Sequence, residues 1–293
     1  MNDVLGDKRA IALLVGPALL VYSLVMVVPI LWSTGYTLFE GSVIRGFTFH
    51  GLGNFRTLAD DGVLWDALVF TVKYAVVTTL LQVALGYLLA VAYVFWFRRS
   101  SGIVRTLLFF PVILPTVAVG LLFQRVFESA PSTGPVNAVL DAVGVGAVDW
   151  FGSPTQAFVV IVAMDLWRSM GFYAVLLYAG LLDIPQDVLE SASLDGARGL
   201  GMLRHIILPL SLPVLLSSVI FSINGTLKVF DSVLALTNGG PGQATTPLTL
   251  YMYQTSFTYG DYGYGSTIAL TLSALCLLVT VFVFRSSRRD LKE

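Results

Sequence analysis

The stretch that decides the fold is Asp183-Ile-Pro-Gln-Asp-Val-Leu-Glu190-Ser-Ala-Ser-Leu-Asp195-Gly196-Ala-Arg198. Asp183 is a residue type that caps helix N-termini, and Pro185 suits a first helical turn, so a helix is expected to begin here. Gly196 interrupts that helix, because glycine readily adopts the left-handed conformation that ends one. A second short helix is expected after Arg198, closed by Leu208-Pro209. The stretch therefore predicts two helices joined by a turn.

Both predicted helices carry apolar residues on one face, while Glu190 and Arg198 are expected to be displayed to solvent. A hairpin of this kind lies at a membrane surface. It serves either as a connector between two spans or as a surface that enters a partner, and the pattern alone leaves both open. The apolar residues are Val188, Leu189 and Ala192 in the first helix, and Leu200, Leu203, Ile206 and Ile207 in the second.

The composition around this stretch is that of an integral membrane protein. The 293 residues are 56% hydrophobic and only 12% charged, with a mean hydropathy of +0.81, whereas soluble domains carry about 25% charged residues. The 17 Lys and Arg balance 18 Asp and Glu, so no basic surface is available for nucleic acid. The single Cys276 excludes a disulfide framework and a thiolate metal site.

Six apolar runs are long enough to cross a bilayer, which takes about 20 residues. They are continuous and do not alternate, so an all-α protein is predicted and not a β-barrel. The first run follows Lys8 and Arg9 as a signal peptide would, but it is too long and no small-residue cleavage site follows, so it is expected to be retained. The predicted spans are Ile11–Trp32, Val69–Phe95, Ile103–Phe127, Gln156–Leu181, Leu208–Val233 and Gly265–Phe284.

The distribution of Lys and Arg predicts the orientation. With the N-terminus inside, eleven of the thirteen Lys and Arg outside the spans fall on the cytoplasmic side, and only Arg45 and Arg56 fall outside. Positive residues accumulate in cytoplasmic loops, so both termini are predicted to be cytoplasmic. The outer loop Leu234–Tyr264 contains the turn cluster Asn238-Gly239-Gly240-Pro241-Gly242. Six aromatic residues between 251 and 264 form either an interfacial belt or an outer docking surface.

The predicted hairpin resembles the EAA motif of ABC importer permeases, which runs E-A-A-x-x-D-G-A, five variable residues, Phe, x-x-I-x-L-P. Ser191 replaces an alanine and Leu203 replaces the phenylalanine, and both changes leave the apolar face intact. The resemblance implies that this loop couples the permease to its ATPase. The residues that carry this expectation are Glu190, Ala192, Asp195, Gly196, Ala197, Leu203 and Pro209.

Further motifs are similar to the carbohydrate-uptake subgroup of these permeases, and within it to the larger maltose-permease subunit. They are Phe230-Asp231, Leu236 to Pro241, Thr245, Tyr253, Phe257 and Tyr262 to Gly265. The resemblance covers about Leu68 to Phe284 and implies a type I ABC importer permease fold with six transmembrane helices. It divides the chain into residues 1–67 (tail, first span and external loop), a permease core at 68–284 containing the coupling loop 183–209, and a tail at 285–293.

The resemblance implies one subunit of a heteromeric sugar importer in a prokaryotic cytoplasmic (inner) membrane. A second, different permease completes the pathway, two ATPase subunits bind ATP and Mg, and an extracellular or periplasmic solute-binding protein delivers a di- or oligosaccharide. The chain itself has no G-x-x-x-x-G-K-[ST] phosphate loop. His50 and His205 fall on opposite sides, and no carboxylate pair is placed for acid–base work. The chain is therefore expected to be no enzyme and to bind no cofactor.

Charged residues within the predicted spans are candidates for the substrate pathway, because such groups are costly in a bilayer. Asp165 and Arg168 lie near mid-membrane as i, i+3 neighbours, and either pair only with each other or line a cavity. Lys228 and Asp231 repeat this spacing. The resemblance places sugar contacts at Asp165, Arg168, Ser169, Phe172, Ser222, Gly225, Thr226 and Val229. Several of these positions are amide or aromatic in the maltose permease, so a different sugar is expected.

Two alternatives remain. An ABC importer of the same architecture would carry a polyol, glycerol phosphate or an amino acid. An ion-coupled secondary transporter would use Asp165 as its ion site, but six spans with one long inner amphipathic loop and no detectable internal repeat disfavour it.

The orientation gives a direct prediction. A reporter fused after Glu293 is expected to be cytoplasmic, and one inserted near Gly146 external, because the Lys and Arg bias places them so. Reporter activity in intact cells measures both positions. A cytoplasmic reporter at Gly146 would overturn the six-span topology.

Overall fold

The computed structural model describes residues 8–42, 44–95, 101–129 and 133–290, and these are helical apart from one hairpin and the loops. The chain forms two compact units. The first comprises residues 1–64 with 252–273, and the second comprises residues 65–251 with 274–293. Both chain termini lie outside the described residues, as do Arg98, Arg99 and Lys292, so the predicted orientation stays a prediction.

The first unit begins with one long apolar helix and continues into the predicted outer loop, which has structure of its own. The elements are α2 (Lys8–Tyr22), the π-helical turn η1 (Ser23–Val27), α3 (Val28–Tyr36), β1 (Phe39–Ser42), β2 (Gly46–Phe49) and α4 (Gly53–Asp60). The beginnings of α5 (Gly62–Phe95) and α15 (Tyr262–Asp290), the end of α14 (Leu248–Tyr253) and η3 (Gln254–Thr258) belong to it as well.

The antiparallel hairpin β1–β2 has no counterpart in the sequence expectation. The Asn54 side chain holds it to α4 by donating to the carbonyls of Thr37 at 2.9 Å and Phe39 at 2.8 Å. Gly263 of α15 lies directly on it, since a Cβ there would come within 1.9 Å of the Phe39 carbonyl oxygen. Four-residue strands give too short a pattern to be recognised in sequence, and long-range contacts stabilise these two.

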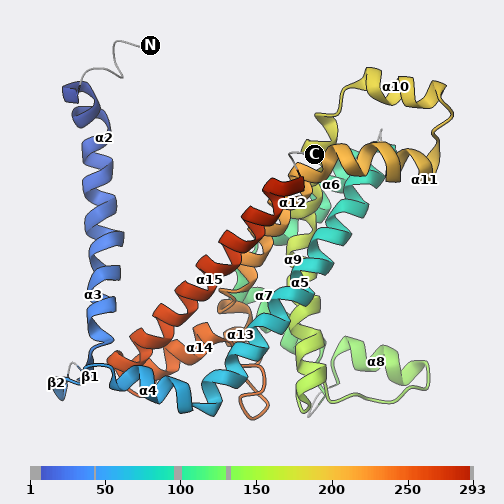
Figure 1. The fold of residues 1–293 in the computed structure, drawn as a ribbon. Helices are drawn as coiled ribbons and strands as arrows, with labels where there is room; N and C mark the ends of the chain where they lie inside the picture. The colour runs from blue at the N-terminus through green and yellow to red at the C-terminus, as the bar shows by residue number, and fades with distance from the viewer. Residues whose placement is uncertain (1–7, 43, 96–100, 130–132, 291–293) are drawn as a thin grey trace. The chain divides into compact units, whose positions relative to one another are not determined.

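The second unit holds the remaining long helices. Its elements are the rest of α5, α6 (Ser101–Ile113), α7 (Thr116–Val126), α8 (Pro135–Ala142), α9 (Pro154–Leu182), α10 (Gln186–Leu194), α11 (Gly199–Met202), the π turn η2 (Leu203–Ile207), α12 (Leu208–Thr226), α13 (Asp231–Leu236), and parts of α14 and α15. Within this unit α8 lies at one end of the long helices, and α10 and α11 lie at the opposite end (Figure 1). The predicted outer and inner loops are therefore separated by the length of the helices.

The third predicted span, Ile103–Phe127, is not one straight helix. The pair Gly102–Ile113 and Thr116–Val126 is bent by 97° at a short break. Pro115 explains the break, because proline lacks an N–H and disfavours a helical conformation in the residue before it. Within the described residues five helices are long and apolar enough to cross a membrane, or up to six if this bent pair is one span.

The fifth predicted span, Leu208–Val233, begins with α12 at Leu208, but its end was wrong. Helix α11, the π turn and α12 run on as one apolar helix from Gly199 to Thr226. Pro209 does not close the second hairpin helix, because the wider π turn just before it avoids the clash between a proline ring and the preceding turn. At the other end the chain leaves the helix at Leu227 and resumes as α13 at Asp231.

Glycines allow close approach of the helices in the second unit. A Cβ at Gly171 of α9 would lie 1.9 Å from the Leu108 carbonyl oxygen of α6, and one at Gly86 of α5 would lie 2.6 Å from the Tyr173 Cβ. Small residues bring helix backbones together in membranes, where packing has to replace the hydrophobic effect as the driving force. These contacts fix α5 and α6 against α9, the helix that carries Asp165 and Arg168.

Candidate functional site

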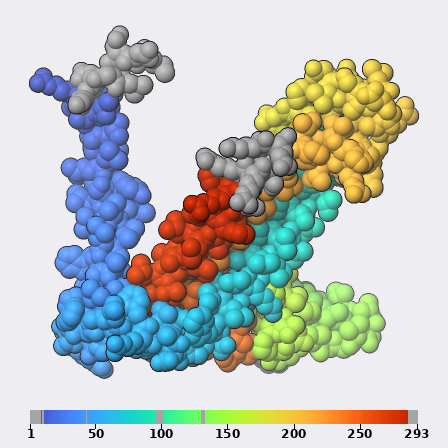
Figure 2. Space-filling model, in the orientation of Figure 1, coloured from blue at the N-terminus to red at the C-terminus, as the bar shows by residue number. Residues whose placement is uncertain are grey.

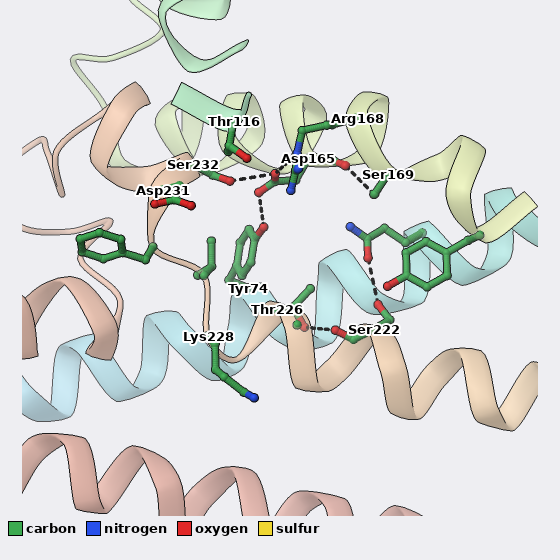
Figure 3. Close-up of a pocket in the computed structure, with 15 residues that line it drawn as sticks. Tyr74, Thr116, Asp165, Arg168, Ser169, Ser222, Thr226, Lys228, Asp231 and Ser232 are labelled. Carbon is green, nitrogen blue, oxygen red and sulfur yellow. Dashed lines mark hydrogen bonds and ion pairs between the residues drawn. The ribbon is translucent and has the colours of Figure 1, made fainter. Parts of the chain in front are cut away.

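A polar cavity of about 220 Å³ lies within the second unit. It is walled by α5, α9, α12, the start of α13 and the non-helical Leu227–Phe230, with Thr116 of α7 at one side (Figure 3). The elements around it are strongly apolar, yet most of its lining is polar or charged. The lining residues are Tyr74, Gln82, Thr116, Asp165, Arg168, Ser169, Tyr173, Ser222, Gly225, Thr226, Lys228, Val229, Phe230, Asp231 and Ser232.

Most of the sequence-predicted pathway residues meet here. Seven of the eight line the cavity: Asp165, Arg168, Ser169, Ser222, Gly225, Thr226 and Val229. Phe172 is not among the lining residues; its ring packs on that of Phe221, with centroids 5.5 Å apart. Trp167 packs against Phe123, 5.8 Å between centroids, and so serves the core.

The Asp165 carboxylate has three side-chain partners in the cavity. Its residue exposure is 4%, and its carboxylate accepts hydrogen bonds from the Tyr74 hydroxyl and, at 2.9 Å, from the Ser232 hydroxyl. The Nε atom of Arg168 lies 3.6 Å from the same carboxylate. Figure 3 shows these three groups converging on Asp165 from α5, α13 and α9. The predicted Asp165–Arg168 pair exists, but the two hydroxyls are the closer partners.

A second network joins α5 to α12. The Ser222 hydroxyl lies 2.9 Å from the Gln82 side-chain oxygen and 3.1 Å from the Thr79 hydroxyl, which lies 3.2 Å from that of Thr226. All four residues are buried. Buried polar groups of this kind need partners inside the protein, so the network fixes the two helices against each other along the cavity wall.

Sequence reasoning missed the residues that α5 contributes. Tyr74 and Gln82 line the cavity and, with Thr78 between them, recur every four residues, so they form one polar stripe on a helix face, and that spacing was visible in the sequence. Ser232 had no such signal, because the break before α13 was not expected. That break also separates Lys228 from Asp231, which do not share a helix; both are exposed, and the described part of the chain shows no ion pair between them.

The hairpin at the other end has the predicted turn. Gly196 has φ +88°, and the Ala197 N–H bonds the Ala192 carbonyl at 2.9 Å while the Gly196 N–H bonds that of Ser193 at 3.2 Å. This is the hydrogen-bond pattern of a Schellman helix end. Glu190 is exposed and accepts a hydrogen bond from Gln186 at 2.9 Å. In Figure 2 the hairpin (yellow) stands out from the end of the second unit.

The predicted apolar face of the hairpin is confirmed for Leu189, Ala192, Leu203, Ile206 and Ile207 but wrong for Val188 and Leu200. Ala192 is buried, and Leu189, Ala197 and Leu203 pack with it into the core of the second unit. The outward apolar side chains are instead Val188, Leu194 and Leu200, exposed by 38%, 89% and 78%. The helix pattern gave the period correctly, but only the tertiary contacts decide which side turns inward. Asp195 and Pro209 are both exposed.

No group of three or more His, Cys, Asp or Glu is arranged to hold a metal ion within the ranges that the structure describes. The chemistry available in the cavity is hydrogen bonding and ion pairing. Such groups bind and release a polar solute inside an apolar bundle.

Comparisons with known proteins agree with this picture. Residues 82–290 match the family described as binding-protein-dependent transport system inner membrane component. The chain is 33% identical to the sulfoquinovosyl glycerol transport system permease protein of Agrobacterium fabrum, over 97% of this chain and 92% of that protein. It is 32% identical to the trehalose/maltose transport system permease protein of Thermococcus litoralis, over 94% of this chain and 92% of that protein.

The fold is that of a solved ABC importer. A chain of the bacterial alginate ABC transporter, in complex with an alginate pentasaccharide-bound periplasmic protein, superposes with a TM-score of 0.86 at 21% identity. The match covers 98% of this chain and 96% of that chain. The chain thus belongs to the binding-protein-dependent transport system inner membrane components, and is a non-catalytic, multi-pass permease subunit of an ABC importer.

Proposed function

We propose that this permease moves a sugar across the cytoplasmic membrane through the cavity between α5, α9 and α12. The observation that carries the proposal is that seven of the eight residues expected to contact sugar line one polar cavity. Sugars offer many hydroxyl groups, and the cavity supplies hydroxyl, amide and charged groups to bond them. Relatives named for transport of sulfoquinovosyl glycerol, trehalose/maltose and lactose support this class of substrate.

The cavity is one wall of a larger pathway. Its volume of about 220 Å³ is below the roughly 300–1,000 Å³ of a pocket that encloses a small organic ligand. Gly225, Lys228 and Asp231 at its edge are exposed. A second, different permease is proposed to close the pathway from that side, so that a di- or oligosaccharide passes between the two subunits.

Two ATPase subunits are proposed to drive the cycle from the hairpin end. The hairpin displays Glu190 one helical turn before the outward Leu194, a combination that fills an apolar groove and adds a charge-assisted bond to Arg or Lys. Its second arm is continuous with α12, so the helix from Gly199 to Gly225 spans about 39 Å at 1.5 Å per residue. A shift of the hairpin is thereby passed along one helix to the cavity wall.

The binding protein is proposed to deliver the sugar at the opposite end, where α8 lies. The Lys and Arg bias supports an external position for the α8 loop and an internal one for the hairpin. Alternating access then needs only that ATP at the hairpin end and sugar at the cavity favour different states of the same helices.

The first test fills the cavity without disturbing the fold. A Cβ at Gly225 would meet no atom within 4 Å, so Gly225→Leu fits the chain and projects into the pathway. Sugar uptake is expected to fall at least about tenfold, while leucine improves the local helix propensity. The measurement is uptake per assembled complex. Gly62→Leu is the matched control, since a Cβ there also meets nothing and lies outside the cavity. Equal uptake in both variants would refute the pathway.

The second test concerns the hairpin. Glu190→Ala is expected to reduce ATPase co-purification and sugar-stimulated ATP hydrolysis, because a desolvated ion pair that loses one partner costs about 2–5 kcal/mol. Asp187→Ala is the control, because Asp187 is also exposed and lies on the same helix α10. The coupling role of Glu190 fails if both variants retain the ATPase equally well.

A further inference from the structure

Four charged residues line the cavity: Asp165, Arg168, Lys228 and Asp231. Their formal charges sum to zero, but they differ in how many hydrogen-bond and ion-pair partners the protein supplies to each. A charge in a low-dielectric site is stabilised only by close partners. The electrostatic preference of the cavity for a ligand therefore depends on which of these groups have partners within the chain.

The two acids are compensated. Asp165 accepts from the hydroxyls of Tyr74 and Ser232, which occupy different oxygens of its carboxylate. Asp231 is exposed at the edge of the cavity, so solvent stabilises its charge. Neither acid depends on a ligand for stabilisation.

The two cations have fewer partners within the chain than Asp165 has. Arg168 reaches Asp165 only at 3.6 Å, and its Nε is a buried atom without a hydrogen-bond partner. A guanidinium has five N–H donors in a planar fork, so most of its donor capacity is unspent. Lys228 makes no ion pair in the part of the chain that is described, but like Asp231 it is exposed at the cavity edge, so the buried unsatisfied donor is that of Arg168. A buried donor left without an acceptor is unfavourable, and a bound acceptor removes that cost.

The amide of Gln82 adds to the excess of donors. Its oxygen lies 2.9 Å from the Ser222 hydroxyl, which donates to it, so its NH₂ group is the end available to a ligand in the cavity. Arg168, Lys228 and Gln82 thus offer donors, whereas the carboxylate of Asp165 already accepts two hydroxyls. The site suits a ligand that presents acceptor oxygens, and above all an oxyanion, because the planar guanidinium fork matches a carboxylate or sulfonate in two parallel bonds.

We propose that the transported sugar carries an anionic group and that Arg168 is the residue that binds it. Tyr74 and Ser232 are positioning residues: by donating to Asp165, they occupy its carboxylate oxygens and leave the guanidinium donors of Arg168 available to a ligand. The inference rests on the proposed sugar pathway and names its substrate class. Carboxylate and sulfonate share the chemistry used here, and the test below uses the carboxylate.

The experiment uses pairs of disaccharides that differ only in a carboxylate in place of a CH₂OH group. Cellobiouronic acid with cellobiose is one pair, and two further pairs with other linkages cover linkage preference. The complete complex of both permeases and the ATPase is placed in nanodiscs without binding protein, so that only the cavity selects. Ligand-induced thermal stabilisation gives the apparent affinity. The acid of at least one pair is expected to bind about tenfold or more tightly than its uncharged counterpart, and this preference is expected to weaken as salt rises.

Variants assign the preference to Arg168. Arg168→Gln is expected to remove it, a loss of about tenfold to a hundredfold for a charge-assisted bond, and Arg168→Lys to keep part of it. Asp165→Asn is expected to keep or strengthen the preference for acid, because the amide oxygen still accepts from Ser232 while the competing charge is gone. If Arg168→Gln assembles poorly because Asp165 is left uncompensated, the double variant Arg168→Gln/Asp165→Asn restores the balance and is expected to show no acid preference.

Arg125→Gln is the matched control, since Arg125 pairs with Glu128 at 3.2 Å, has a 78% exposed side chain and does not line the cavity. It is expected to leave the preference unchanged. The inference is overturned if acid and uncharged members bind equally, if no pair binds, or if the preference survives in Arg168→Gln. Binding of uncharged sugars that Gly225→Leu abolishes would leave the sugar pathway standing and remove only the anionic class. Failure of every sugar, charged or not, would remove the pathway as well.

Discussion

Water does not reach the hydrocarbon core of a bilayer, so each polar group placed there needs a partner within the protein. Asp165 shows the consequence most clearly. The residue is only 4% exposed, and its carboxylate accepts hydrogen bonds from hydroxyls of two other segments. Tyr74 of α5, Asp165 of α9 and Ser232 of α13 are thereby fixed to one another. The network of Ser222, Thr79, Gln82 and Thr226 joins α5 to α12 by buried hydrogen bonds in the same way. These bonds set the walls of the cavity and the positions of its remaining donors.

Broken helices open the space that these bonds surround. The chain leaves helical geometry between Thr226 and Asp231, and the bent pair α6–α7 turns by 97° beside Pro115. Without those breaks, α12 and α13 would fill the region with continuous apolar surface. A continuous helix, in contrast, joins the hairpin to the cavity, since the helix from Gly199 to Thr226 runs unbroken through a π turn. On the proposed mechanism, the breaks make room for a solute, and the continuous helix passes motion of the hairpin to the cavity wall.

The sequence predicted the elements that depend on local pattern. The turn at Gly196 needs only a glycine at a helix end, four of the six predicted spans follow from apolar length, and resemblance located seven cavity residues. Features set by tertiary contacts were missed. The side of α10 that faces inward and the strands held by Asn54 depend on neighbours distant in sequence. The bend beside Pro115 has a local cause, but it was not predicted. Tyr74 was also missed, although the sequence contained a signal for it: the polar stripe that it forms with Thr78 and Gln82 on α5. The domain boundaries at 67 and 284 stay predictions.

The central claim is that the cavity is a pathway that opens to alternate sides of the membrane. Gly225→Cys in a Cys276→Ala background places one thiol at the exposed edge of the cavity, with open space around it. Labelling by a membrane-impermeant maleimide from each side of proteoliposomes, with and without a trapped ATP analogue, measures access directly. The account predicts that the reactive side reverses when ATP is trapped. Labelling from the same side in both states, or from neither, would contradict it.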